Sequence, residues 1–235
     1  MNVMGMLTGS KFRSMSVENL LGRTLNDIET KYAPELLYVQ GPLEIPLPCP
    51  RVSVIGTRKP SPEGLADAQS IAKTLAKNQI IIVSGLAEGI DTEAHRAAID
   101  SGGRTIAVLG TPLNKVYPQK NSELQQEIME GHLAISQFPV EYPTTRKNFI
   151  IRNRTMALIS DASIIVEAGD SSGSLHQGWE TLRLGRPLFI WKSLLSNSEL
   201  DWPKTMLEYG AMELADPMDV LEVIPSHLKM IDLFQ

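Results

Sequence analysis

The feature that most constrains this chain is a repeated alternation between continuous aliphatic segments and amphipathic segments. Short apolar runs occupy residues 52–56, 80–85, 105–110 and 162–167. They are too uniformly apolar for a sheet with one face in water, and are typical of strands buried on both faces. Between them, apolar residues return at helical spacing, for example in residues 63–77. The pattern predicts an α/β fold, with a mostly parallel sheet and helices on both faces.

The first 50 residues differ from the rest, and we expect them to form an N-terminal helix and an extended lead-in. The helix is expected over residues 16–31 and a short strand over 33–39, and four prolines follow within residues 41–50. Proline disfavours helical backbone in the residue before it, so this last part is expected to be extended. Residues 51–235 are predicted to form the core domain, because the length suits one large domain with a short appendage.

The composition argues against several classes of protein. A net charge of −5 disfavours a protein that coats nucleic acid with its whole surface, but it allows a local basic site. Cys49 is the only cysteine, which excludes an internal disulfide. Because the sequence shows no membrane-spanning run and no signal-peptide pattern, we expect a cytoplasmic protein without a membrane partner. The scattered histidines predict no metal site, and we expect no cofactor.

Glycine and hydroxyl side chains gather where the predicted strands end, in residues 56–59, 84–91, 110–112 and 167–174. The carboxyl ends of parallel strands form the ligand-binding edge of such a sheet. Glycine allows close backbone approach, and free N–H groups at helix N-termini favour phosphate. We therefore expect a phosphate-containing ligand there. The GxxxxGK[ST] and GxGxxG motifs are absent, which disfavours P-loop nucleotide hydrolysis and a Rossmann dehydrogenase, and without a GxSxG elbow a serine nucleophile is also disfavoured.

A second concentrated feature is the basic segment of residues 144–154, which contains four basic residues, no acidic residue and one aromatic residue. Basic side chains follow a phosphate backbone, and an exposed aromatic ring can stack on a base. The same pattern also fits a solvated helix start with Phe149 in the core. The residues of the segment leave both interpretations open.

These motifs together resemble the DNA-processing protein A family (DprA, also called Smf). The resemblance covers residues 35 to 192 and rests on residues 54–58, 83–91, 103–110, 116–118, 149–154, 166–168 and 172–175. It implies an extended Rossmann-like core without a catalytic step. It also implies binding of single-stranded DNA, a homodimer, and loading of a RecA-type recombinase during recombination or natural transformation.

The resemblance also implies which residues form the DNA site. Carried over by position, they are Gly56, Thr57, Arg58, Ser84, Gly85, Lys147, Phe149, Arg152, Arg154, Gly173 and Ser174. The chain departs from the family pattern after Gly173-Ser174-Leu175, where the family has Thr-Ala and this chain has His176-Gln177.

Two alternatives use the same core. One is a nucleoside monophosphate phosphoribohydrolase of the so-called lysine-decarboxylase-like group. Gln177 stands where the catalytic glutamate of that group would fall, and a glutamine cannot supply general acid–base chemistry. Glu180 lies three residues on and could replace it. Glu167 is another carboxylate near the expected ligand edge, but it matches the DprA pattern and is interpreted as structural. The other alternative is a nucleotide-sensing module that binds a free nucleotide without turnover.

Overall fold

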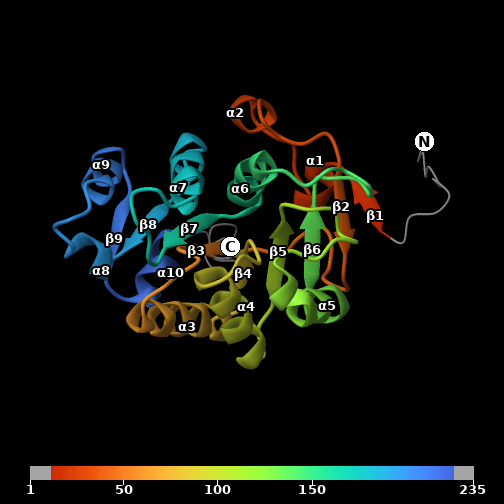
Figure 1. Cartoon of the computed structure of the whole chain (residues 1–235). Coiled ribbons are helices and arrows are strands. Elements are labelled where there is room, and N and C mark those ends of the chain that lie inside the picture. The colour runs from red at the N-terminus through yellow and green to blue at the C-terminus, as the bar shows by residue number, and fades with distance from the viewer. Residues whose placement is uncertain (1–11, 225–235) are drawn as a thin grey trace, which may run out of the picture.

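The computed structural model describes residues 12–224, which form a nine-stranded sheet with helices on both faces (Figure 1). The order of the strands is β1-β2-β6-β5-β4-β3-β7-β8-β9. From β6 to β9 the neighbours are parallel, whereas β2 pairs antiparallel with both β1 and β6. The strands are β1 (Arg13–Met15), β2 (Leu37–Gln40), β3 (Arg51–Ile55), β4 (Ile81–Ser84), β5 (Thr105–Leu109), β6 (Leu133–Ser136), β7 (Ala162–Ile165), β8 (Leu188–Trp191) and β9 (Met212–Leu214). The predicted mostly parallel α/β fold is confirmed.

The helices form one layer on each face of the sheet (Figure 1). They are α1 (Val17–Leu21), α2 (Asp27–Thr30), α3 (Pro62–Lys77), α4 (Ile90–Asp100), α5 (Ser122–Gly131), α6 (Arg146–Ile159), α7 (Ser174–Arg183), α8 (Lys192–Leu195), α9 (Trp202–Glu208) and α10 (Val220–Val223), with 3-10 turns at Gln119–Asn121 and Pro217–Asp219. Helices α1, α6 and α9 share one core with the sheet. Helices α3, α4 and α10 share a second core with the opposite face, and α5 packs in a third.

The continuous apolar strands explain why the sheet carries two helical layers. Successive side chains of a strand point to opposite faces. In β3, Val54 packs in the core under α3 and α4, and the next residue, Ile55, packs in the core under α6. All five residues of β3 and all four of β7 are buried, so neither face of the central sheet meets water.

The N-terminal segment differs from the sequence-based expectation. The predicted single helix over residues 16–31 is wrong, because α1 ends at Gly22, which adopts a left-handed backbone with φ 69°. Helix α2 then begins after a new capping box formed by Asn26 and Glu29. Strands β1 and β2 extend the same sheet through β6. The division of the chain at residue 50 into a lead-in and a core domain stays a prediction.

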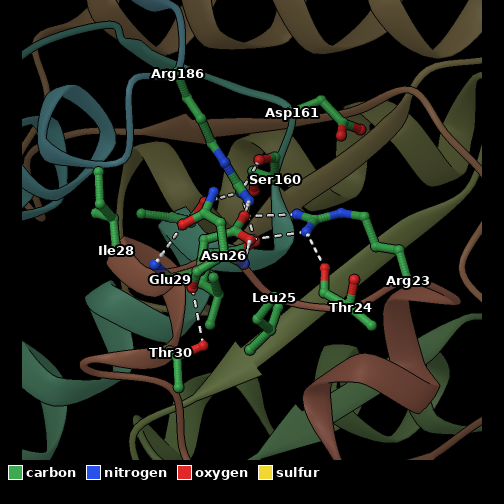
Figure 2. Close-up of polar contacts among 12 residues, drawn as sticks. Arg23, Thr24, Leu25, Asn26, Ile28, Glu29, Thr30, Ser160, Asp161 and Arg186 are labelled. Carbon is green, nitrogen blue, oxygen red and sulfur yellow. Dashed lines mark hydrogen bonds and ion pairs between the residues drawn. The ribbon is translucent and has the colours of Figure 1, made fainter.

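Helix α2 is attached to the rest of the molecule by a buried carboxylate, that of Glu29 (Figure 2). The carboxylate forms ion pairs with Arg23 at 2.6 Å and with Arg186 at 2.7 Å. Arg186 also donates to the carbonyl groups of Ala157, Leu158 and Ser160 at the end of α6. These contacts join the N-terminal segment to the helix that carries the basic residues.

Helices capable of crossing a membrane are absent from the part of the chain that the structure describes.

Candidate functional site

The connections of the sheet reverse direction between β3 and β7. From β3 the chain moves outward through β4, β5 and β6, and it then returns to the other side of β3 to form β7, β8 and β9. In sheets of this kind, the ligand site lies outside the carboxyl ends of the strands where the direction changes. The loops that follow β3 and β7 meet at this point, where the Thr57 N–H donates to the Glu167 carbonyl oxygen at 2.7 Å.

A cavity of about 650 Å³ opens at this point. Its lining comes from the end of β3, from the loops after β3, β4 and β5, from α6, from the loop before α7, and from the first turns of α4 and α7. The lining residues are Ile55, Gly56, Thr57, Arg58, Lys59, Ala87, Asp91, Tyr117, Arg146, Phe149, Ile150, Arg152, Asn153, Met156, Ser171, Ser172, Gly173, Ser174 and Gln177.

A cation and two aromatic rings form one group in the cavity lining. The guanidinium of Arg58 lies over the Phe149 ring, 5.7 Å from its centroid. The Phe149 ring packs against Gly110 at the end of β5, and its centroid is 5.2 Å from that of Tyr117. Arg58 is exposed and Tyr117 is 48% exposed. The group therefore offers a positive charge and aromatic surface to a ligand from solvent.

Arg152 forms part of the cavity wall. It is only 4% exposed, and its Nη1 donates to the Val108 carbonyl oxygen at 2.7 Å. A Cβ atom at position 85 would lie 1.7 Å from Arg152 Nη1, so Gly85 is needed for the close approach of the guanidinium. Burial raises the pKa of the Asp91 carboxyl group, and the positive charge of Arg152 opposes that rise. Arg152 therefore supports the loop after β4 from within the protein.

The loop before α7 closes another side of the cavity. The Asn153 side-chain amide donates to the Gly173 carbonyl oxygen at 3.0 Å, and the hydroxyl groups of Ser172 and Ser174 are 2.6 Å apart. Gln177, in the first turn of α7, is fully buried. Both of its side-chain amide atoms lack a hydrogen-bond partner among residues 12–224.

The two carboxylates considered for acid–base chemistry are already engaged. The Glu167 carboxylate accepts hydrogen bonds from the Ser61 N–H and hydroxyl group, at the start of α3. Glu180 forms ion pairs with Arg154 at 3.1 Å and with Arg183 at 2.7 Å. Neither carboxylate lines the cavity. A cluster of metal-ligating side chains is also absent from residues 12–224.

Seven of the eleven residues predicted for the site line the cavity, namely Gly56, Thr57, Arg58, Phe149, Arg152, Gly173 and Ser174. The other four do not. Ser84 is buried and donates to the Val54 carbonyl oxygen, and Gly85 lies behind Arg152. Lys147 is exposed, and Arg154 lies 4.8 Å from the centroid of the Tyr32 ring.

Several lining residues were not among the eleven predicted for the site, including Lys59, Tyr117, Arg146, Asn153 and Gln177, although the segments that contain them had been singled out in the sequence. Arg146 could have been found from helical spacing, because positions 146, 149, 153 and 156 return to the same face of a helix and all four line the cavity. Helical spacing could not have identified Tyr117, because it lies in a loop of irregular backbone that brings its ring to Phe149.

Comparison with known proteins identifies the family. The model of a family described as DNA recombination-mediator protein A matches residues 17–225. The chain belongs to this family. The resemblance on which the sequence analysis relied is thereby confirmed.

Members of the family are similar to the chain in sequence and in structure. DNA processing protein DprA of Streptococcus pneumoniae is 38% identical over 190 residues, which are 80% of this chain and 66% of that protein. The X-ray structure of DNA processing protein A from S. pneumoniae superimposes with a TM-score of 0.77 and 32% identity, over 92% of this chain and 76% of that chain. DNA processing protein A from Helicobacter pylori, which has a single-stranded DNA binding mode, superimposes with a TM-score of 0.72 and 27% identity, over 94% of this chain and 98% of that chain.

The chain spans between 50% and 66% of the length of the first curated relatives that it matches. The similarity therefore covers only part of each relative, and the activity of the whole relative is not assigned to this chain.

Proposed function

We propose that this chain binds single-stranded DNA in the cavity at the carboxyl ends of β3 and β7, as a DNA-processing protein in DNA uptake or recombination. The observation that carries the proposal is the group of Arg58, Phe149 and Tyr117. A cation attracts the phosphate backbone, and aromatic rings stack on bases of any sequence. Membership of the family and the single-stranded DNA binding mode of the H. pylori relative support the same ligand.

The proposal includes binding without catalysis. A hydrolase that cleaves a glycosidic bond needs carboxylates next to the sugar. Glu167 and Glu180 are held in hydrogen bonds and ion pairs outside the cavity lining, and Gln177 has no acid–base chemistry. Asp91 lines the cavity but is buried against the Gly85 N–H. A homodimer, a RecA-type recombinase partner and a cytoplasmic location also belong to the proposal.

The test is fluorescence anisotropy with a labelled oligo-dT at two salt concentrations, with duplex DNA and AMP as competitors. We expect binding that weakens as salt rises, because counterions are released when cations contact phosphates. We also expect duplex DNA and AMP to displace the labelled strand poorly. Duplex DNA has no unpaired bases to offer the site, and AMP has only one phosphate.

Absence of binding to oligo-dT would contradict the proposal. Displacement by AMP at stoichiometric concentration would favour a nucleotide sensor, and release of ribose 5-phosphate from AMP would favour the phosphoribohydrolase.

A further inference from the structure

Gln177 is a fully buried polar side chain whose hydrogen-bonding capacity is unused. It lines the cavity from the first turn of α7, and neither Oε1 nor Nε2 has a partner among residues 12–224. Buried amides without partners are destabilising, and they are rare in native proteins. An unused amide in a residue that lines a cavity is therefore explained best by a ligand that completes its hydrogen bonds.

The buried residues that line the cavity together with Gln177 suit a neutral group. Ile55 and Met156 contribute apolar surface to this cavity, and Ser174 contributes a hydroxyl group. The buried charges, Asp91 and Arg152, have opposite signs. The exposed lining is different, because it contains the cations Arg58, Lys59 and Arg146.

We propose that Gln177 is a specificity-determining residue whose carboxamide binds the edge of one nucleobase, while the neighbouring phosphates stay at the exposed cations. This inference rests on the proposed binding of single-stranded DNA. A carboxamide places a donor beside an acceptor, and the edge of a base presents the complementary pair. A phosphate group presents acceptors alone, so it would satisfy Nε2 and leave Oε1 unpaired.

The remaining lining fits a base as well. Binding sites for small ring systems combine apolar walls with a few placed polar groups. Ile55 and Met156 supply such walls, and Phe149 offers a ring for stacking at the same cavity. Because the amide atoms are covered in the free protein, the base reaches them with a shift of the surrounding wall.

The test compares oligo-dT with an abasic strand of the same length and charge, by anisotropy, for the wild type, Gln177→Leu and the control Gln126→Leu. Leucine keeps the approximate volume and removes both polar atoms, and Gln126 is exposed on α5 outside the cavity lining. We expect Gln177→Leu to weaken binding of oligo-dT about five-fold or more and to leave binding of the abasic strand within about two-fold. We expect the control to bind both strands as the wild type does.

The stability of the free variant gives an independent readout. Removing two buried polar atoms that lack partners should raise the melting temperature of Gln177→Leu. A lower melting temperature together with unchanged discrimination between the two strands would show a structural role and overturn the proposal.

Two further results would overturn it. One is a folded Gln177→Leu variant that binds oligo-dT with wild-type affinity. The other is equal affinity of the wild type for oligo-dT and the abasic strand, which would show that the cavity contacts the backbone alone. By contrast, if the wild type bound neither strand, the proposed function itself would fail.

If Gln177→Leu does not fold, the wild-type protein still decides the question. The side-chain amide resonance of Gln177 in a nitrogen-15 NMR spectrum should shift on addition of oligo-dT and stay unchanged with the abasic strand. An amide resonance that does not respond to oligo-dT would overturn the proposal.

Discussion

At the scale of single residues, Arg58 is the exposed cation that lies over an aromatic ring of the cavity. We expect Arg58→Ala to weaken binding of single strands of any sequence by about 1–3 kcal/mol, because a charge-assisted contact to phosphate is lost. Anisotropy with several oligonucleotide sequences measures the change. Arg96→Ala is the matched control, since Arg96 is exposed on α4 and does not line the cavity. Unchanged binding by a folded Arg58→Ala variant would remove this residue from the site.

At the scale of elements, the attachment of α2 depends on the charge of Glu29 (Figure 2). The hydrogen bond from Arg23 lowers the pKa of the Glu29 carboxyl group to about 2, against the opposing effect of burial. Because this pKa is below its unfolded value of about 4.3, the stabilisation is present at neutral pH. It is lost as the pH falls from about 4 towards 2. We expect Glu29→Gln to lower the free energy of unfolding by about 3 kcal/mol at pH 7.

Urea unfolding at pH 7 and at pH 3 tests this prediction. The difference between the wild type and Glu29→Gln should be smaller at pH 3, because Glu29 is then mostly protonated in the unfolded chain, whereas the folded carboxylate, with a pKa of about 2, is still largely charged. Glu35→Gln, on an exposed residue of the same segment, should show little difference at either pH. A difference for Glu29→Gln that is the same at both pH values would contradict the role assigned to its charge.

At the scale of the whole molecule, an acidic protein carries a local cationic site. The net charge is −5, whereas Arg58, Lys59 and Arg146 all lie in the cavity lining. If these three cations contact phosphates, the logarithm of the binding constant should fall with the logarithm of salt concentration with a slope of about −2. Between 50 and 200 mM salt, this corresponds to a loss of affinity of roughly twenty-fold.

The slope also shows which charges contribute. Arg58→Ala and Arg146→Ala should each make it shallower by about 0.7, because each removes one phosphate contact. Arg96→Ala should leave it unchanged. A slope near zero for the wild type would show that the cations do not contact phosphates.

Much of the fold could be predicted from the sequence, because the local pattern of apolar residues reflects how a segment is buried. Continuous aliphatic runs occur where a strand is covered on both faces, and β3 and β7 are buried along their whole length. The same pattern predicted that the glycine-rich loops would gather at the carboxyl ends of the strands. It did not predict which strands, far apart in the chain, would pair with each other. The sequence shows a strand near residue 37, but not that β2 would pair with β6 in an antiparallel direction.

The sequence by itself determined the class of sheet, the positions of most strands and helices, and the residue types available at the strand ends. The tertiary structure alone decided which of those residues share a cavity. Arg152 and Arg154 are two positions apart in one basic segment, yet Arg152 is buried against Gly85 and Arg154 pairs with Glu180. A helix turns about 100° per residue, so neighbours in sequence face different surroundings. Those surroundings are set by elements that come from distant parts of the chain.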